Sequence, residues 1–447
     1  MNRAFAIKLG TIAFLILILM LALSMIGDLI EERQAQREYV IQDIARSSSY
    51  NQKITGPLLV VPYKKKIRNW QINSKTHERI AVESEIDGRL YFLPEKFVLN
   101  GTVLTELRTR GIYEANLYHA NSKISGHFEL PENLGIEDHV EHYQFDAPYL
   151  AMGISDIRGI GNALKLNING ETISFKPGSL VSLLGSGVHA PLKAMDNAEP
   201  RTLAFEFDLK LQGTGQLDVT PVGRESEVIL KSDWPHPSFV GEYLPAKHEI
   251  TDNGFSAHWS TSYFSTNMKE ALNECTSELR CDSFRSRHFG VNLINPVDQY
   301  LKSERAIKYA LLFIALTFAG FFLFEVLKSM AVHPVQYGLV GLALAFFYML
   351  LLSLSEHIGF TLAYLLSSTA CVSLIGFYVS FVLGSFVRGG GFAAGLTALY
   401  AMLFALLNSE DYALLMGSIL LFGLLGVVMV LTRKLDWYSV GATNQSA

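Results

Sequence analysis

Hydrophobic and polar residues follow three different patterns along the chain. Residues 9–26 form one apolar run without a charged side chain, and a hydrocarbon core of roughly 30 Å requires about 20 helical residues to cross it. From residue 58 to about residue 265 the pattern alternates, as where Phe205, Phe207 and Leu209 alternate with charged side chains. Such alternation is typical of a β-strand with one buried face. Beyond Arg305 long apolar helical stretches return, so the sequence predicts a membrane protein of the α+β class.

The first apolar run has two interpretations. Arg3 and Lys8 precede it and Ala22-Leu23-Ser24 resembles a signal-peptidase site, as in a secretory signal peptide. The apolar core of a signal peptide is typically about 7 to 15 residues long, however, and this run is longer. The pattern therefore favours an uncleaved transmembrane signal anchor over residues 1–27, with cleavage as the alternative.

A connector and a β-rich domain follow the anchor. Residues 28–56 are rich in charge with Tyr39, Ile41 and Ile44 interspersed, which predicts an amphipathic helical connector. Residues 57–304 are predicted to form a large, mainly antiparallel, sandwich-like β domain. Four dipeptides in it are typical of tight hairpin turns: Asp87-Gly88, Asn100-Gly101, Asn169-Gly170 and Asn253-Gly254.

The C-terminal part is predicted to be a bundle of about five transmembrane helices over residues 305–435. Their apolar stretches lie at residues 306–327, 337–354, 360–382, 392–407 and 412–432. Residues 436–447 then form a short tail.

The positive-inside rule gives the expected topology. With a cytoplasmic N-terminus, the basic residues of the short loops and ends all lie inside: Arg3, Lys8, Lys328, Arg388, Arg433 and Lys434. The two short outer loops, around Glu356-His357 and Glu410-Asp411, contain no Lys or Arg. Both termini are therefore expected in the cytoplasm and the β domain in the periplasm of a bacterial inner membrane.

The composition excludes some classes of function. The chain is 49% hydrophobic and 18% charged, with a formal net charge of −5, and it lacks a dense Lys/Arg tract. We therefore expect the lipid bilayer as a partner and no nucleic acid.

Several short motifs occur in a set order over about 200 residues. In the β domain they are Ser232-Asp233-Trp234-Pro235-His236-Pro237-Ser238-Phe239, Leu244-Pro245-Ala246-Lys247, Gly254-Phe255, Ala257-His258-Trp259 and Pro296-Val297-Asp298-Gln299-Tyr300. In the helical part they are Tyr309-Ala310-Leu311-Leu312, Ile314-Ala315-Leu316-Thr317-Phe318, Leu354-Ser355-Glu356-His357-Ile358-Gly359-Phe360, Leu406-Leu407-Asn408-Ser409 and Asp436-Trp437-Tyr438. Together these motifs resemble the CreD family of bacterial inner-membrane proteins. The resemblance implies a protein of cell-envelope integrity, stress response and colicin tolerance, in some members with altered β-lactam susceptibility. It implies no established catalytic activity.

The chain has three cysteines. Cys275 and Cys281 lie in a stretch outside the family motifs, and in an oxidising periplasm they could close a small disulfide loop, with two free thiols as the alternative. Cys371 falls within the fourth predicted span and is expected to be a small buried hydrophobic side chain.

The sequence shows no catalytic signature, since it contains no Gly-x-Ser-x-Gly, Walker loop or His-Glu-x-x-His motif. Gly159-Ile160-Gly161 is expected to be a turn. One cluster could bind an envelope ligand or a metal if the strands bring its members together: Trp234, His236, His248, His258 and Trp259. It has no Cys or acidic partner at metal-like spacing, so packing is favoured, and we expect no metal and no cofactor.

Four polar residues are candidate membrane sites: Glu325, Glu356, His357 and Asp411. Ionisable groups within a bilayer usually mark a pathway or a partner site. Glu325 lies in the last two turns of its span, where reaching the interface or pairing with Lys328 is favoured. The other three lie at loops, where they can be hydrated.

Three functional hypotheses follow. The leading one is a non-enzymatic envelope protein whose periplasmic β domain contacts or senses envelope components or other membrane proteins. The second is a small transporter or channel, against which the predicted spans contain almost no ionisable groups at mid-depth. The third is a periplasmic hydrolase, which for glycoside chemistry requires two carboxylates roughly 5 to 10 Å apart. The ligand and the oligomeric state are left open.

Overall fold

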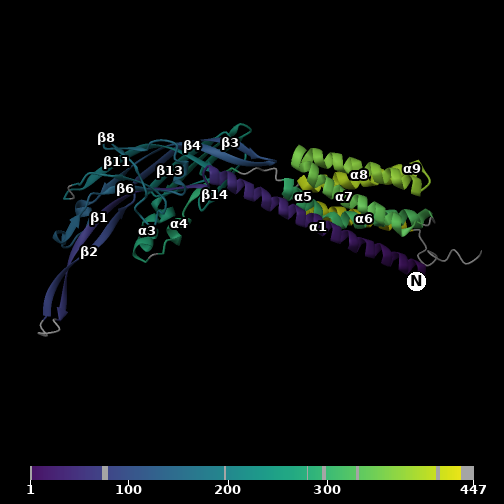
Figure 1. Ribbon diagram of the computed structural model, residues 1–447, viewed down its shortest axis with the longest axis horizontal. Helices are drawn as coiled ribbons and strands as arrows, with labels where there is room; N and C mark the ends of the chain where they lie inside the picture. The colour runs from purple at the N-terminus through teal and green to yellow at the C-terminus, as the bar shows by residue number, and fades with distance from the viewer. Residues whose placement is uncertain are drawn as a thin grey trace, which may run out of the picture. The chain divides into compact units, whose positions relative to one another are not determined.

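The computed structural model describes residues 3–72, 79–195, 198–278, 280–293, 299–328, 332–408 and 413–433. The chain divides into two compact units. We call Met1–Glu38 together with Val297–Ala447 the helical unit, and Tyr39–Pro296 the β unit. Figure 1 shows the chain coloured from its N-terminus to its C-terminus.

The N-terminal helix α1 is a single element, Arg3–Ser47, of 45 residues. It joins the predicted anchor and connector without a break, beginning in the helical unit and ending in the β unit. The helix ends at a run of serines, whose hydroxyls compete for backbone groups: Ser47 Oγ donates to Asp43 O at 3.0 Å, and Ser49 Oγ donates to Gln212 O at 2.7 Å. The first strand then begins at Gln52, earlier than the predicted domain start at residue 57.

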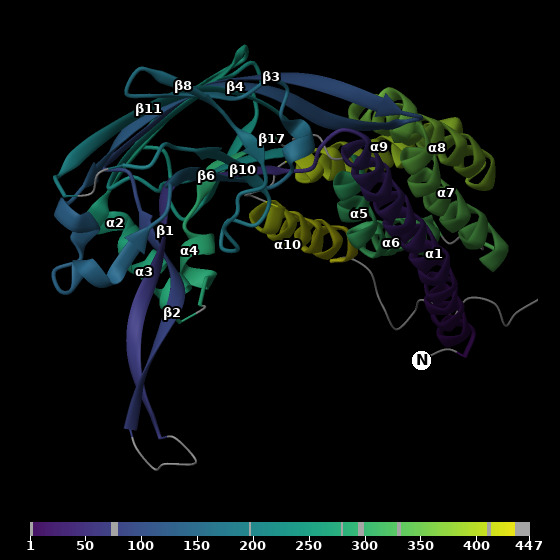
Figure 2. The same cartoon turned by 60° about the vertical axis from the view of Figure 1, so that its left-hand side comes forward.

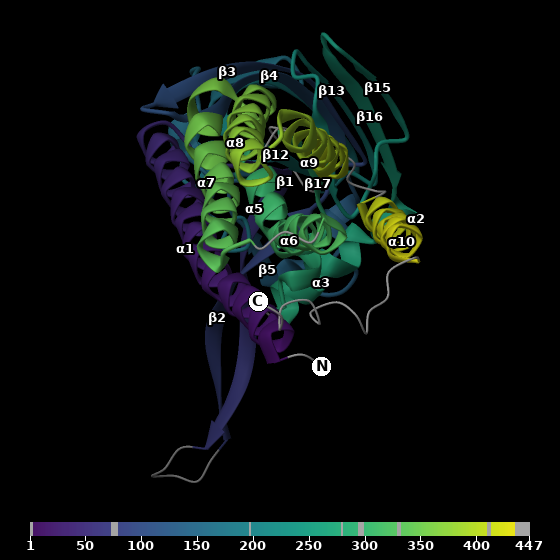
Figure 3. The same cartoon turned by 90° about the vertical axis from the view of Figure 1, so that its right-hand side faces the viewer.

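The helical unit contains six further helices in the described residues. They are α5 (Gln299–Lys308), α6 (Ala310–Lys328), α7 (Pro334–Ile358), α8 (Phe360–Val382), α9 (Phe386–Asn408) and α10 (Ala413–Thr432). Figure 3 shows α7, α8 and α9 next to one another. The core of the helical unit is rich in aromatic side chains, among them the fully buried Phe318 and Phe321 of α6 and Phe347 of α7.

The number of possible membrane spans agrees only in part with the predicted anchor and bundle of about five helices. By length and composition, α1, α7, α8 and α9 could cross a membrane, and the α5–α6 pair adds a fifth if it counts as one span. The predicted span over residues 306–327 contains a break near its start, where α5 and α6 meet and are bent by 46°, so most of this span lies in α6. The last predicted span corresponds to α10, whose crossing of the bilayer stays a prediction.

Local sequence signals fix the helix ends. His333 caps α7, its ring accepting a hydrogen bond from Val335 N at 3.3 Å, and Pro334 occupies the first helical position, where it needs no amide partner. Gly359, with φ 76°, separates α7 from α8. A residue with a side chain would be strained there, so the glycine makes the sharp reversal possible.

The β unit contains two sheets. The nine-stranded sheet runs β14 (Pro237–Gly241), β17 (Phe289–Leu293), β12 (Gln216–Thr220), β1 (Gln52–Ile72), β6 (Tyr149–Ile154), β10 (Gly187–Pro191) and β9 (Lys176–Pro177), while β2 (Arg79–Phe92) and β5 (Tyr143–Phe145) also pair with β1. The eight-stranded sheet runs β15 (Lys247–Thr251), β16 (Gly254–Ser262), β13 (Glu225–Ser232), β3 (Lys96–Arg110), β4 (Tyr113–Leu130), β11 (Arg201–Thr214), β7 (Lys165–Ile168) and β8 (Glu171–Ser174). Only β1–β12 and β13–β3 pair in parallel among the described strands.

Short helices complete the β unit. They are the 3₁₀ segments η1 (Glu132–Gly135), η2 (Val140–His142) and η3 (Ile157–Gly159), and the α-helices α2 (Tyr263–Thr266), α3 (Met268–Ser277) and α4 (Asp282–Ser286). Gly159-Ile160-Gly161 lies at the end of η3, in agreement with the predicted turn.

The core of the β unit lies between the sheets, which Figure 2 shows as two layers. Strand β11 alternates as predicted, with buried Leu203, Phe205 and Phe207 on one face and exposed residues on the other. Apolar side chains from both sheets thus form one continuous cluster, which confirms the mainly antiparallel sandwich-like prediction.

Two of the four hairpin signals are wrong. Asn169-Gly170 and Asn253-Gly254 lie at the β7–β8 and β15–β16 turns, whereas Asp87-Gly88 lies within β2 and Asn100-Gly101 within β3. At Gly88 a Cβ atom would overlap the ring of Tyr63, and at Gly101 it would lie 2.8 Å from Leu230 Cδ2. These two glycines therefore serve close packing rather than a turn.

A long two-stranded ribbon extends from the nine-stranded sheet. β1 and β2 pair from Leu59 opposite Phe92 to Ile72 opposite Arg79, and β5 contacts β1 only at residues 63–65. The ribbon projects clearly in Figures 1 and 2. Cross-strand charges pair along it, with Arg68 Nη2 lying 3.2 Å from Glu83 Oε1.

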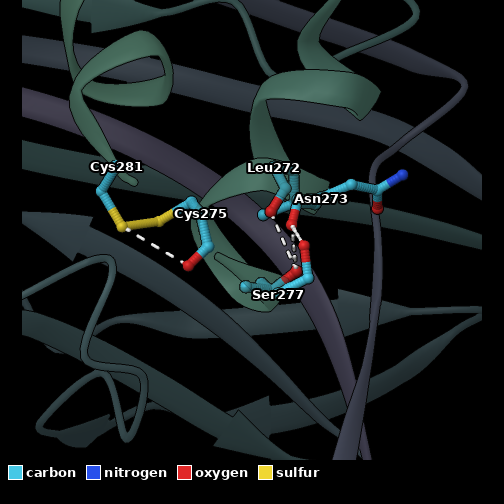
Figure 4. Close-up of a disulfide and its surroundings, with 6 residues drawn as sticks. Leu272, Asn273, Cys275, Ser277 and Cys281 are labelled. Carbon is cyan, nitrogen blue, oxygen red and sulfur yellow. Dashed lines mark hydrogen bonds between the residues drawn. A yellow bond between two sulfur atoms is a disulfide. The ribbon is translucent and has the colours of Figure 1, made fainter. Parts of the chain in front are cut away.

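A disulfide joins Cys275 in α3 to Cys281 just before α4, with Cα atoms 4.2 Å apart (Figure 4). Cys275 is buried, and α3 also places Met268, Ala271 and Leu272 in the β-unit core. The bond therefore closes a short loop that leads from one core-packed helix to the next.

Replacing both Cys275 and Cys281 by Ala is expected to lower the free energy of unfolding of the β unit by about 2 kcal/mol, since a loop this short restricts the unfolded chain only modestly. Thermal unfolding of the purified chain, followed by near-ultraviolet circular dichroism, measures the change. Mass spectrometry of alkylated, unreduced peptides provides the control. Alkylation of both thiols in chain taken from native membranes would contradict the bond.

Candidate functional site

Trp259 is part of an aromatic core at one end of the two sheets. Its side chain is fully buried, its Nε1 donates to Tyr243 O at 3.2 Å, and its ring stacks on Phe289 with centroids 5.2 Å apart. Phe239 of β14 meets the same ring edge-on at 5.6 Å. The tryptophan thus joins strands of both sheets, which is a packing role.

The three histidines of the predicted cluster do not converge. On β16, His258 lies between the buried residues Ala257 and Trp259. Successive side chains of a strand point to opposite faces, so His258 lies on the face opposite to Trp259. Its Nε2 lies 3.1 Å from Glu227 Oε1. His248 instead packs against Phe239, with ring centroids 5.5 Å apart.

Trp234 and His236 form a local contact in the loop before β14. The indole Nε1 of Trp234 donates to His236 O at 3.1 Å, and the two rings meet edge-on at 6.3 Å. Together with the two prolines beside His236, this contact stiffens the loop. The described contacts of these five residues are thus packing, loop and ion-pair contacts, and they do not bring the three histidines together.

A polar groove lies beside His258, where β13 and β3 begin and β16 ends. It has a volume of about 510 Å³. Hydroxyls and charged groups line it: Lys96, Glu225, Ser226, Glu227, Ser260, Thr261, Ser262 and Ser265. Thr261 Oγ1 is buried without a hydrogen-bond partner within the described chain. Such a lining can bind a ligand rich in hydroxyl or amide groups.

The strand register explains the groove. Glu225 pairs with Ser262 and Glu227 with Ser260 across the antiparallel β13–β16 ladder. Directly opposed residues share a face, so the two carboxylates and two hydroxyls line up. Sequence reasoning missed the groove, because each strand alone shows only the ordinary alternation of an exposed face.

A second polar cluster lies in the nine-stranded sheet. The parallel β1–β12 register places Lys53 beside Asp218, and Gln216 Nε2 donates to both Asp218 carboxylate oxygens, at 3.0 and 2.8 Å. Burial raises the pKa of Asp218 and lowers that of Lys53, so both shifts oppose the charged forms. Lys53 Nζ donates to Arg285 O in α4, and the nearby His288 has its Nδ1 buried without a partner in the described residues.

In the helical unit, Glu325 is a buried carboxylate near the end of α6. Its partner is Lys8 of α1, which forms an ion pair with Oε1 and also donates to Val332 O at 3.1 Å. Tyr337 donates to Oε2 at 2.9 Å and Val332 N to Oε1 at 3.2 Å. Lys8 is 317 positions away from Glu325 in the sequence, and the side chain of the suggested partner Lys328 lies outside the described part of the chain.

Glu356 is the corresponding carboxylate near the end of α7. Its side chain is only 9% exposed, Tyr300 donates to its Oε1 at 3.0 Å, and Arg33 Nε of α1 lies 3.8 Å from the same oxygen. His357 is exposed, with its Nδ1 3.1 Å from Ser353 O. Asp411 and its neighbour Glu410 lie outside the described residues.

We call these two contacts the α1 clamps. Lys8 and Arg33 are 25 residues apart, which corresponds to about 38 Å of helix, slightly more than the roughly 30 Å hydrocarbon core. Between them Leu19 and Leu23 are buried in the helical core. At Gly341 of α7 a Cβ atom would overlap Leu19 Cδ1, so the glycine lets α1 approach closely.

The middle of the helical unit is polar only through hydroxyl and thiol groups, as far as the structure describes it. Tyr364 Oη donates to Tyr400 O at 2.7 Å, and Tyr400 Oη contacts Cys371 Sγ at 3.3 Å. Cys371 is buried, as expected. The clamps thus place the buried carboxylates at the ends of the helices, whereas ion and proton pathways usually carry ionisable groups at mid-depth.

The chain is similar in sequence to known proteins of one family. The chain matches the family model described as Inner membrane protein CreD over residues 4–438. It is 37% identical over 440 residues to Inner membrane protein CreD of Escherichia coli (strain K12), an alignment that covers 98% of this chain and 95% of the relative.

Solved structures give only weak likenesses. An M1 zinc metallopeptidase from Deinococcus radiodurans is 6% identical over 38% of each chain with a TM-score of 0.17. Native yeast LTA4 hydrolase is 9% identical, covering 51% of this chain and 35% of that one, with a TM-score of 0.20. Scores this low support no inference about fold or function. The match over nearly the whole sequence, in contrast, shows that this chain belongs to the CreD family of inner membrane proteins.

Proposed function

We propose that this inner membrane protein is non-enzymatic and that its β unit contacts or senses envelope components in the periplasm, anchored by the helical unit. The observation that carries the proposal is the pair of α1 clamps. They make α1 an integral part of the helical unit, and the same uninterrupted helix continues into the β unit.

The clamps favour an uncleaved α1 over a cleaved signal peptide. Removing residues up to Ser24 would take Lys8 from Glu325 and Leu19 and Leu23 from the helical core. An unpaired buried carboxylate is costly, so the mature protein is expected to keep this helix.

The periplasmic placement rests on the distribution of basic residues. Lys8 and Arg388 belong to ends or loops that the positive-inside rule assigns to the cytoplasm. The loop around Glu356-His357 lacks Lys and Arg and is assigned to the other side. Arg33 contacts Glu356, so under this proposed topology the α1 residues that follow Arg33 leave the bilayer on the periplasmic side.

The polar groove is the surface proposed to meet an envelope component. Its carboxylates, hydroxyls and the Lys96 ammonium can exchange hydrogen bonds with a glycan or a peptide. Arg224 stacks over Tyr263 at its border, with the guanidinium carbon 5.5 Å from the ring centroid.

The groove also fits the alternative hypothesis of a glycoside hydrolase, because Glu225 and Glu227 both line it. Alternate residues of one strand lie about 7 Å apart, within the range for paired catalytic carboxylates. They lie on the same side of the groove, however, whereas such carboxylates flank the bond that is cleaved. The geometry therefore favours binding over hydrolysis.

A photo-reactive residue at Ser260 tests the proposal. Ser260 is exposed on β16 and lines the groove, so crosslinking in native cells is expected to capture an envelope component reproducibly and intact. Thr172, exposed on β8 outside the groove, is the matched control position and should give no such product. Mass spectrometry identifies the adducts. No adduct at Ser260 in correctly inserted protein, or adducts equal to those at Thr172, would contradict the proposal.

A cysteine at Ser260, in the Cys371→Ala background, tests the topology. A membrane-impermeant maleimide is expected to label it in cells with a permeabilised outer membrane and an intact inner membrane. Labelling only after the inner membrane is lysed would place the β unit in the cytoplasm and overturn this part of the proposal.

Charge reversal tests the first clamp. Lys8→Glu brings two carboxylates together in a largely buried site and is expected to lower the free energy of unfolding by about 3 kcal/mol. The Lys8→Glu/Glu325→Lys double variant should recover most of that loss. Thermal unfolding in detergent measures both.

The exposed ribbon pair provides the control, since Arg68→Glu should cost less than about 1 kcal/mol. Equal unfolding temperatures for wild type and Lys8→Glu would show that the clamp contributes nothing to the anchoring of α1.

A further inference from the structure

The segment between β4 and β5 carries three metal-ligand side chains on one short turn. His139, Glu141 and His142 each offer one ligand atom, and these atoms all lie within 4.8 Å of one another. Two imidazoles and a carboxylate form a ligand set found in zinc sites. We propose that His139, Glu141 and His142 form a binding site for a divalent transition-metal ion of the Zn²⁺ type.

The closest pair already has the spacing of metal ligands. His139 Nδ1 lies 3.2 Å from Glu141 Oε1. Two ligands about 2.0 to 2.1 Å from a tetrahedral zinc are roughly 3.3 Å apart. An ion could therefore bind between these two atoms with little movement of either side chain.

The backbone of the turn places the third ligand. His139 has φ 56° and ψ 44°, a left-handed conformation that is uncommon for a residue with a side chain. His142 N donates to His139 O at 2.9 Å and closes the turn, and the two imidazole rings lie nearly parallel, 5.2 Å apart between centroids. Because all three side chains are exposed, His142 is free to rotate by the small amount that coordination requires.

The chemistry of the ligands selects the class of ion. Two of the three donors are imidazole nitrogens, which suit zinc and its neighbours, whereas calcium and magnesium prefer oxygen donors throughout. Three protein ligands leave a fourth position for water or an external donor. The site is thus an open one, on the surface of the β unit.

The turn is fixed on one side to the root of the β1–β2 ribbon. Tyr143, directly after His142, starts β5 and pairs with Lys65 of β1. Its ring packs 5.2 Å from that of Tyr63, and Lys65 Nζ lies 4.8 Å above it. A bound ion would therefore tie the turn to the place where the ribbon leaves the sheet. This inference is independent of the polar groove.

Zinc titration of the full chain tests the site. The chain is purified in detergent, freed of any affinity tag and of metal, and titrated with Zn²⁺ by isothermal calorimetry. The His139→Ala/His142→Ala double variant is expected to lose one equivalent of bound zinc. Glu141→Gln should weaken binding at this site about tenfold or more, since even outer partners of metal ligands contribute that much.

His119→Ala is the matched control. His119 also pairs with a glutamate, its Nε2 lying 3.0 Å from Glu106 Oε2, but it belongs to no group of three such ligands in the described chain. This variant should bind zinc as the wild type does. No zinc binding by the wild type, or the same stoichiometry and affinity in the double variant, would overturn the site.

X-ray absorption at the zinc edge identifies the ligand atoms directly and does not depend on the number of zinc equivalents bound. The wild type loaded with one equivalent of zinc should show histidine nitrogens at about 2.0 to 2.1 Å. A spectrum without imidazole scattering would contradict the proposed ligands even if zinc binds.

Discussion

A carboxylate buried at the end of an apolar helix bundle requires a cation, because removing its charge from water is costly unless the charge is paired. The helical unit has two such carboxylates, Glu325 and Glu356, and α1 supplies a cation near each of them. The distance between Lys8 and Arg33 along the helix, about 38 Å, is enough to span the roughly 30 Å hydrocarbon core. The position of α1 against α7 depends on these pairs, and so do the proposals that the mature chain keeps α1 and that α1 leaves the membrane on the periplasmic side.

The β unit depends on a different constraint, the filling of one core between two sheets. Trp259, Phe239 and Phe289 hold the strands together at one end, and α3 adds its apolar face. Because apolar side chains fill this core, the polar groups that could bind a ligand lie on the outer faces and at the strand ends. The polar groove and the His139 turn both lie there, which is why each is accessible to a ligand.

The sequence predicts most of this architecture because apolar length and strand alternation are local signals. It does not predict the break between α5 and α6, since the residues around Tyr309 carry neither a proline nor a glycine. It also misassigns Gly88 and Gly101, whose role is set by Tyr63 and Leu230 on other strands. Contacts between distant residues have no local signature.

The candidate sites show the same limit. Glu325 stands out in the sequence, but its partner Lys8 is visible only when α1 and α6 are folded together. The five candidate residues around Trp259 do not meet in one site, partly because neighbouring positions on β16 alternate between faces, which separates His258 from Trp259. His139, Glu141 and His142 are adjacent enough to be noticed, yet only the left-handed turn at His139 shows that their side chains converge.

Crosslinking between α1 and α7 tests the central claim most directly. Cysteines at Leu19 and Gly341, in a chain with Cys371→Ala, replace two residues that the structure places in direct contact. A mild oxidant in native membranes is expected to join them within one chain, whereas a cysteine at the exposed Leu17 paired with Gly341→Cys should remain unjoined. Loss of the first 24 residues from the mature protein, or equal crosslinking from both positions, would contradict the account.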